Sequence, residues 1–301
     1  MVEKPRIRIL QPGDEAALEA FLLPRIASSM FLLGNMRTAG LEDEGEPYQG
    51  TYAAAFTEGK IVSVVAHYWN NALIFQAPVH LDALWRKAVE VSGRPIGGLI
   101  GPEEQVDAVK EGLDIDESRI QLDETERLYT LALDELVMPG VLASGQAVAR
   151  RAEPHDLAFL VAWRVAYGEE TLGESDTGDS RERARSTVER LIRQKRTWVL
   201  EVEGEPVACS SFNTATEEAV QVGGVWTPPD IRSRGYGRAV AAASLLEARA
   251  EGVATAVLFT GQENIPAQRA YAALGFRHVG AYRMLLLNPA LGSGDLAQTR
   301  S

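Results

Sequence analysis

The sequence predicts an α/β chain of the α+β kind, made of two similar domains in tandem. Its 301 residues give room for about two domains of typical size. A composition of 46% hydrophobic and 24% charged residues is typical of a globular chain with a packed core. The same order of strand and helix patterns occurs in each half, at a spacing of roughly 140–150 residues. We interpret this repeat as an internal duplication.

Predicted strands in the first half are short segments in which apolar residues alternate, or run together between turn residues. They are residues 6–10, 51–58, 60–68, 71–78, 99–100 and 128–133. Predicted helices have apolar residues at helical spacing, at 15–25, 80–92 and 102–112. Pro24 perturbs the first of these helices, because proline lacks a backbone donor and clashes with the preceding turn.

The second half repeats this order. Its strands are predicted at 147–151, 198–203, 207–213, 219–227 and 254–260, and its helices at 157–167, 181–195, 239–249 and from 264 onward. We therefore predict domains at 1–137 and 147–301, joined by a linker at 138–146 that is punctuated by Pro and Gly. An unrelated α/β domain in the first half is the alternative.

One stretch of the second half combines a strand, a glycine turn and a helix. Val222 to Trp226 is predicted as a buried strand, and Pro228-Pro229 ends it because proline cannot continue a sheet ladder. Strong helix formers follow from Ala239. The turn between them holds glycines without a Cβ and arginines whose forked side chains match phosphate, next to the unpaired N–H groups of a helix start. These features predict a pyrophosphate cradle, with an ordinary glycine turn as the alternative.

Other phosphate-binding motifs do not fit this turn. No Lys-Ser or Lys-Thr follows the glycines, as a P-loop requires, and Val240 stands where a dinucleotide fingerprint needs a small residue. Arg232-x-x-Gly235-x-Gly237 instead resembles the acyl-CoA signature of the GNAT superfamily of N-acyltransferases. The segment from Asn264 to Phe276, Asn-Ile-Pro-Ala-Gln-Arg-Ala-Tyr-Ala-Ala-Leu-Gly-Phe, is similar to that family's second signature, with every fixed position filled. The resemblance covers residues 147–290.

The resemblance implies two tandem GNAT-like domains, each a mixed, mainly antiparallel twisted sheet flanked by helices. It implies N-acetyltransferase activity with acetyl-CoA as cosubstrate and without a metal ion, and the scattered His and Cys residues show no metal-ligand spacing. The implied cofactor-binding residues are Val225, Trp226, Thr227, Arg232, Ser233, Arg234, Gly235, Tyr236, Gly237, Arg238 and Asn264. The first domain has neither signature, so we expect it to bind no cofactor and to shape one wall of the substrate site.

Within this resemblance, backbone N–H groups of Val225 to Thr227 hold the pantetheine arm and the thioester oxygen, and Gly223-Gly224 allows the strand to distort. Tyr271 is the implied general acid, because tyrosine and thiol pKa values lie close enough for proton transfer to a leaving thiolate. A core tyrosine is the alternative. Asn264 is either a cofactor contact or a plain helix cap.

The general base is left open by the sequence. Gln221 stands where some family members carry a glutamate, and the nearest carboxylates are Glu201, Glu203, Glu217 and Glu218. A base is unnecessary if the acceptor amine has a low pKa. The segment 169–179 is acidic, with the carboxylates Glu169, Glu170, Glu174, Asp176 and Asp179. It would attract a cationic amine to the acceptor site, or it is a solvated surface loop.

Charge and cysteine content limit the partners and the compartment. Residues 1–149 hold 12 Lys and Arg against 23 Asp and Glu, a net charge of −11, whereas residues 150–301 hold 18 against 19, a net charge of −1. The acidic half would repel nucleic acid, so we expect no nucleic-acid partner. Cys209 is the only cysteine, which fits a reducing cytoplasm, and we propose no acyl-cysteine intermediate. No leader and no run of membrane-span length is evident, so we expect no membrane partner.

The predicted function is transfer of an acetyl group from acetyl-CoA to a primary amine of a small molecule or peptide, by direct attack in a ternary complex. The alternative is a non-catalytic acyl-CoA-binding sensor or assembly module, which Gln221 and the degenerate first half favour. The sequence leaves open the identity of the amine, the acyl chain length and the oligomeric state, with a homodimer as one option.

Overall fold

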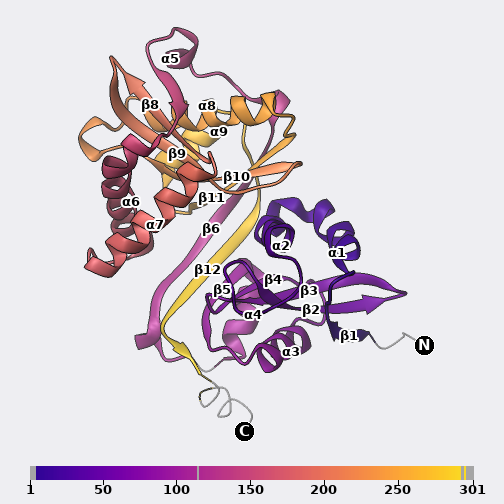
Figure 1. Ribbon diagram of the computed structural model, residues 1–301. Helices are drawn as coiled ribbons and strands as arrows, with labels where there is room; N and C mark the ends of the chain where they lie inside the picture. The colour runs from indigo at the N-terminus through magenta and orange to yellow at the C-terminus, as the bar shows by residue number, and fades with distance from the viewer. Residues whose placement is uncertain (1–4, 114, 293–294, 296–301) are drawn as a thin grey trace. The chain divides into compact units, whose positions relative to one another are not determined.

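A computed structural model describes residues 5–113, 115–292 and 295 (Figure 1). Its contacts divide the chain into two compact units. Unit 1 holds the described residues up to Leu128 and those from Gly280 onward, and unit 2 is Tyr129–Val279. Strands β6 (Ile120–Ala132) and β12 (Arg277–Leu291) have residues in both units. The chain therefore enters unit 2 along β6 and returns to unit 1 along β12.

The bounds of these units differ from the predicted domains in two places. The predicted linker 138–146 lies inside unit 2, where it contains the short helix α5 (Gly140–Ala143), and β12 belongs mostly to unit 1. Backbone pairing explains the second difference, since Tyr282 to Leu286 pair antiparallel with β5 of unit 1. The division into compact units rests on contacts and does not test the functional domains 1–137 and 147–301, which stay a prediction.

Unit 1 is a mixed sheet flanked by helices. Its strands run in the order β1-β2-β3-β4-β5-β12, and within it the pair β4–β5 is parallel while β1–β2, β2–β3, β3–β4 and β5–β12 are antiparallel. The strands are β1 (Arg6–Ile9), β2 (Gly50–Thr57), β3 (Lys60–Tyr68), β4 (Ala72–Gln76) and β5 (Ile96–Pro102). The helices are α1 (Glu15–Leu22), η1 (Leu23–Arg25), α2 (Ile26–Ala39), α3 (Leu81–Ser92), α4 (Glu103–Glu111) and η2 (Glu117–Arg119).

Helix α2 was not predicted. Its apolar residues are not confined to one stripe, because much of its circumference is buried, and the periodicity of an amphipathic helix is therefore absent. The expectation that no run reaches membrane-span length was wrong, because the segment Glu15–Ala39 is long and apolar enough to cross a membrane by length and composition alone. In the fold, a short 3₁₀ turn at η1 interrupts it, and Leu18, Leu22 and Leu33 are fully buried in the core of unit 1.

His67 makes the stability of unit 1 depend on pH. Its side chain is fully buried, with Nδ1 2.7 Å from Ser92 Oγ and Nε2 3.1 Å from the Pro95 carbonyl oxygen. Burial lowers its pKa from 6.5 to about 4. Between these two pH values the unfolded chain binds more protons than the native chain, so the free energy of unfolding falls as pH falls through this window. We expect a loss of about 3 kcal/mol in total, or about 1.4 kcal/mol per pH unit.

Urea unfolding at several pH values between 7 and 4 measures this effect, and His67→Gln serves as the control because it cannot titrate. The wild type should lose more stability across the window than the variant, and parallel pH profiles would contradict the assignment.

Unit 2 has the same architecture. Its strands run in the order β11-β10-β9-β8-β7, with β6 beside β11; β10–β11 is parallel, and β7–β8, β8–β9 and β9–β10 are antiparallel. The strands are β7 (Val148–Arg151), β8 (Thr197–Val202), β9 (Glu205–Ala215), β10 (Ala219–Trp226) and β11 (Thr255–Gly261). The helices are η3 (Leu133–Glu135), α5, η4 (Pro154–Asp156), α6 (Leu157–Leu172), α7 (Gly178–Arg193), η5 (Pro229–Ile231), α8 (Tyr236–Ala250) and α9 (Ile265–Ala272).

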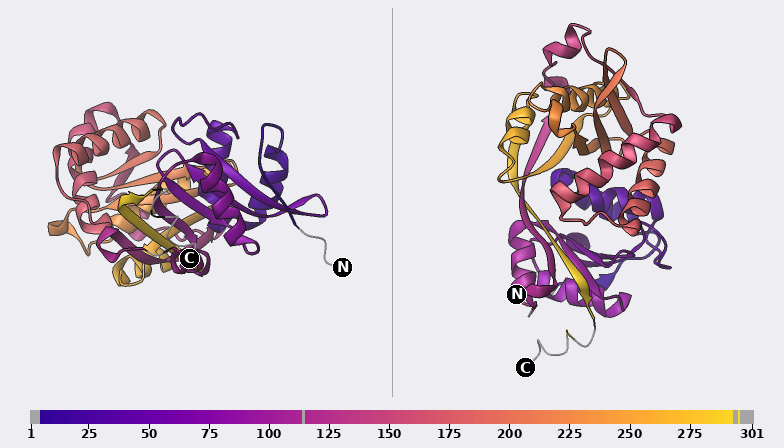
Figure 2. Two further views of the ribbon diagram at one scale, coloured as in Figure 1. Left: turned by 90° about the horizontal axis from the view of Figure 1, so that it is seen from below. Right: turned by 90° about the vertical axis from the view of Figure 1, so that its left-hand side faces the viewer.

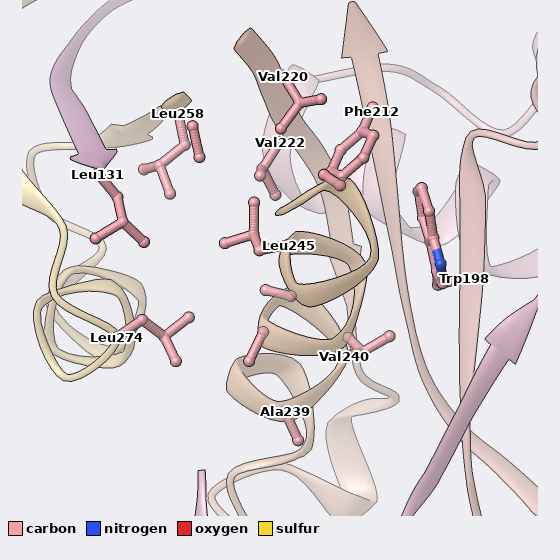
Figure 3. Close-up of a cluster of buried hydrophobic side chains, with 14 of the residues drawn as sticks. Leu131, Trp198, Phe212, Val220, Val222, Ala239, Val240, Leu245, Leu258 and Leu274 are labelled. Atoms are coloured by element: carbon pink, nitrogen blue, oxygen red, sulfur yellow. The ribbon is translucent and has the colours of Figure 1, made fainter. Parts of the chain in front are cut away.

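Two layers of helices cover opposite faces of the unit 2 sheet. Helix α8 packs on one face, where Val240 and Leu245 lie with Trp198, Phe212 and Val222 in one hydrophobic cluster (Figure 3). Helices α6 and α7 pack side by side on the other face (Figure 2). A second hydrophobic cluster on that face includes Val199, Cys209 and Trp226. Residues next to each other in a strand point to opposite faces, so β8 supplies both clusters. The mixed, mainly antiparallel fold predicted for both halves is confirmed.

Candidate functional site

The centre of the candidate site is the second half of β10, where this strand parts from β11. The parallel pairing runs from Ala219 opposite Thr255 to Val222 opposite Leu258. Within the described residues no β10–β11 pair follows, although β10 continues to Trp226 and β11 to Gly261. The edge of β10 that faces β11 is therefore open from Gly223 onward. Backbone N–H groups along an open edge are available to a ligand.

A bulge on the other side of β10 accompanies this opening. Gly223 lies opposite Ser211 of β9 and Trp226 opposite Cys209, so β10 advances three residues while β9 advances two. Gly224, inside the bulge, has a φ of +58°. A bulge bends its strand and increases its twist, which turns β10 away from its parallel neighbour. The distortion predicted at the glycine pair is present.

Asn213 is a residue of this region that sequence reasoning missed. It is a bulged residue of β9, between Phe212, which pairs with Val222, and Thr214, which pairs with Gln221. Its amide lies so close to Gly223 that a Cβ there would be 2.1 Å from Asn213 Nδ2. The only sequence signal of such a neighbour is Gly223 itself, whose missing side chain leaves room for the Asn213 amide.

The glycine turn brings the start of α8 against the end of β10. Ser233 and Gly235 have φ values of +64° and +81°, and backbone of this kind turns successive N–H groups into one concavity. Helix α8 begins at Tyr236, three residues before the predicted start. A Cβ on Gly237 would lie 3.4 Å from Thr227 Oγ1 and 3.6 Å from Val225 Cγ1. The unpaired N–H groups of the helix start and the open edge of β10 therefore lie next to each other.

Among the residues that the structure describes, two of the three arginines of the turn have no acidic partner. Arg234 is exposed, Arg238 is half-buried, and neither has a carboxylate within ion-pair distance among the described residues. Arg238 reaches back over the turn, because its Nη2 lies 3.7 Å from where a Cβ of Gly235 would be. Both guanidinium groups are thus available to an anion at the turn. Arg232 differs, because its two terminal guanidinium nitrogens donate to the two carboxylate oxygens of Glu170 in α6, at 2.8 and 2.9 Å.

The second signature forms α9 and the turn that follows it. Asn264 is the N-cap, and its Oδ1 accepts a hydrogen bond from the Ala267 N–H at 3.1 Å, which is the capping role. Tyr271 lies two turns later, half-buried, with its ring 5.9 Å from the Phe276 ring at an angle of 68°. It packs against the same hydrophobic cluster as α8. The two signatures therefore lie on neighbouring helices of one unit.

Gly275, in the second signature, is required by the backbone. Its φ is +101°, and a Cβ there would lie 3.1 Å from the Glu135 carbonyl oxygen. We expect Gly275→Ala to lower the free energy of unfolding by about 2 kcal/mol, because a side chain is strained at this φ and meets main chain. Urea unfolding measures the loss. Gly261→Ala is the control, since a Cβ there meets nothing within 4 Å. Equal stability of the two variants would be the contrary result.

The acidic segment is less free to attract a cation than its sequence suggests. Three of its five carboxylates are in ion pairs with arginines: Glu170 with Arg232, Glu174 with Arg164 and Asp176 with Arg181. Glu169 and Asp179 are exposed, and Asp179 lies in the first turn of α7, where the helix dipole favours a negative charge. The segment acts mainly as a set of ion-pair partners.

The buried polar groups on β9 and β10 are poor proton acceptors. Gln221 is 2% exposed, and its Nε2 donates to the Val222 carbonyl oxygen at 3.1 Å. Burial raises the pKa of the Cys209 thiol to about 12, which keeps it protonated and disfavours an acyl-cysteine. Glu201 accepts a hydrogen bond from Arg150 Nε at 2.8 Å. Within the described residues there is no cluster of three or more His, Cys, Asp or Glu arranged to hold a metal ion.

In unit 1 the corresponding parallel pair is closed. Strands β4 and β5 pair at Ala72–Ile74, and a Cβ on Gly101 would lie only 3.0 Å from Phe75 Cβ, so the two strands stay in contact beyond the paired residues. Gln76 Oε1 accepts hydrogen bonds from the Ser28 and Ser29 hydroxyls at 2.7 and 3.1 Å. Only four residues separate β4 from α3, against nine between β10 and α8. Unit 1 therefore repeats the fold without the open edge and the long turn.

Comparison with known proteins places these observations in a family. Residues 159–276 match the model of the Acetyltransferase (GNAT) family. Among solved structures, a Drosophila protein is 14% identical, with 93% of this chain and 98% of that chain covered and a TM-score of 0.64. A GCN5-related N-acetyltransferase from Sphaerobacter thermophilus is 13% identical, with coverages of 95% and 96% and a TM-score of 0.57. A search of curated proteins found no match.

A tandem GNAT protein from the clavulanic acid biosynthesis pathway is also similar, at 13% identity, with 94% of this chain and 98% of that chain covered and a TM-score of 0.57. At these identities the structures establish the fold, and the family match establishes the domain. The chain therefore carries a GNAT-family acetyltransferase domain at residues 159–276 and shares its two-part fold with a tandem GNAT protein.

Proposed function

We propose that unit 2 transfers an acetyl group from acetyl-CoA to a primary amine of a small molecule or peptide, within a ternary complex. The family match supports acyl transfer in general. The observation that carries the finer proposal is the open edge of β10 beside the start of α8. This place presents backbone donors together with Arg234 and Arg238, which have no carboxylate partner within the part of the chain that the structure describes. A cytoplasmic location and a homodimer stay predictions.

The residues present fit an anionic, elongated cosubstrate. Gly237 lets the start of α8 lie against Thr227 and Val225, because a Cβ there would already contact both residues. The amides of the α8 start suit a diphosphate. Arg234 and Arg238 would neutralise its charge, and Ser233 to Gly237 would hold it through the backbone. The open edge from Val225 to Thr227 would hold an amide-containing arm as a neighbouring strand would.

The chemistry requires little from charged side chains. Bound acetyl-CoA would supply the acetyl group as a thioester. The amine nitrogen would form a bond to the carbonyl carbon as the carbon–sulfur bond breaks. Backbone N–H groups of Val225 to Thr227 would stabilise negative charge on the carbonyl oxygen, and the Tyr271 hydroxyl would protonate the departing sulfur. Gln221 could accept a hydrogen bond from the amine but no proton, so the amine should arrive neutral. The proton that its nitrogen loses on becoming an amide would restore the Tyr271 hydroxyl, directly or through solvent.

A panel of amines tests the proposal through release of free thiol from acetyl-CoA. The wild type should release thiol in proportion to the acetylated amine found by mass spectrometry, at rates that rise with the neutral fraction of each amine. Absence of product across primary amines of low and high pKa, with intact acetyl-CoA binding, would contradict catalysis.

That outcome would favour a non-catalytic acyl-CoA sensor or assembly module. Gln221 is the observation behind this alternative, because it is buried, hydrogen-bonded to the main chain and unable to take a proton. Calorimetry and the thiol assay together separate the two functions. A sensor binds acetyl-CoA in the calorimeter but releases no thiol when amines are present.

A further inference from the structure

Arg232 is held by three different groups of unit 2. Its Nε donates to the Thr227 carbonyl oxygen at 2.9 Å, and its guanidinium carbon lies 4.7 Å from the centre of the Trp226 ring. Its two terminal nitrogens bind the two carboxylate oxygens of Glu170 at 2.8 and 2.9 Å. Thr227 and Trp226 belong to the end of β10, whereas Glu170 lies near the end of α6. Arg232 therefore ties α6 to the open end of β10.

The contact with Glu170 uses the part of Arg232 that a phosphate would use. A guanidinium fork binds a carboxylate and a phosphate in the same bidentate way, through two parallel N–H donors. Arg234 and Arg238, on either side of Gly235, have no such carboxylate among the described residues. One cation of the turn is thus neutralised by the protein's own side chain.

The pair is easily exchanged. The Arg232 and Glu170 side chains are 37% and 51% exposed, and exposed ion pairs contribute little to stability because water and salt screen them. The contacts with Thr227 and Trp226 do not involve the carboxylate, so they can keep the guanidinium in place when Glu170 leaves. An anionic ligand can therefore replace Glu170 at the Arg232 guanidinium while the backbone of the turn stays in place.

We propose that Glu170 competes with the anionic ligand of the turn for Arg232. In the empty protein the carboxylate occupies the fork, and a bound diphosphate takes its place and releases the end of α6. Glu170 thus lowers the affinity for the cosubstrate and links its binding to the segment from Glu169 to Asp179. This inference rests on the proposed function insofar as the ligand is coenzyme A.

The experiment compares Glu170→Gln with Glu169→Gln by titration calorimetry, with coenzyme A as the probe so that no chemistry takes place. Both variants remove one negative charge from the end of α6, but only Glu170 pairs with Arg232. We expect Glu170→Gln to bind coenzyme A about two- to fivefold more tightly than Glu169→Gln. Adding Arg232→Gln should cancel this gain, because the two side chains are coupled. Urea unfolding checks that each variant is folded.

Equal affinities of Glu170→Gln and Glu169→Gln would overturn the proposal, because they would reduce the effect to general charge. Weaker binding by Glu170→Gln would also overturn it, since Glu170 would then orient Arg232 for the ligand. If the variant tightens coenzyme A binding but the wild type acetylates no amine, the proposed function fails and this inference stands. If neither the wild type nor the variant binds coenzyme A, both are wrong.

Discussion

Replacing Gly237 by glutamate is expected to abolish binding of acetyl-CoA. Gly237 lies in the first turn of α8, and its missing Cβ would stand 3.4 Å from Thr227 Oγ1 and 3.6 Å from Val225 Cγ1. A longer side chain would crowd the contact between the helix start and the strand end, and its carboxylate would stand close to the ligand's phosphates. Like charges at an interface oppose binding by several kcal/mol, so affinity should fall at least about a hundredfold.

Titration calorimetry measures the loss, and two further variants control for unrelated effects. Gly237→Ala should keep most of the affinity, because contacts of 3.4 and 3.6 Å are ordinary for a Cβ. Gly140→Glu adds the same charge in α5, where a Cβ meets nothing within 4 Å, and should bind as the wild type does. Wild-type affinity in Gly237→Glu would refute the assignment of the cradle.

The second large effect is expected at Tyr271. Tyr271→Phe should lower kcat by about a hundredfold or more, which is the usual contribution of a positioned general acid. The dissociation constant of acetyl-CoA should change little, because phenylalanine keeps the ring that packs against Phe276 at 5.9 Å.

Steady-state kinetics with a competent amine, together with calorimetry, separate these two quantities. Tyr129→Phe is the matched control, since Tyr129 is a buried tyrosine of the same hydrophobic cluster in unit 2. Its kcat should stay near that of the wild type. A Tyr271→Phe enzyme with undiminished kcat would remove Tyr271 from the mechanism and leave it as a core residue.

Elements with strong local signals were predicted closely. β3 was predicted at the residues it occupies, Lys60–Tyr68, because its apolar run is bounded by turn residues on both sides. Helix α3 begins one residue after its predicted start, at Leu81, and ends at the predicted Ser92. Gly93, with a φ of +64°, ends that helix in the left-handed conformation typical of a C-cap.

Elements whose partners are distant in sequence were predicted less well. β6 extends back to Ile120, although only its last residues were predicted as a strand. This part of the strand is rich in charged residues and therefore lacks the apolar alternation that predicts a strand. In the fold these charges have partners, because Asp123 accepts hydrogen bonds from Lys110 Nζ at 2.5 Å and from Arg283 Nε at 2.8 Å. A strand signal based on apolar alternation does not anticipate such pairs.

By itself, the sequence determined the order of strand, glycine turn and helix around Gly235 and the two signatures that point to a GNAT domain, because backbone preferences and residue spacing are local properties. Only the tertiary structure decided that β10 leaves β11 after Val222 and that Glu170 binds Arg232, which is 62 residues away in sequence. Strand register and ion-pair partners depend on residues that only the fold brings together. A sequence pattern does not indicate which distant carboxylate binds a given guanidinium group.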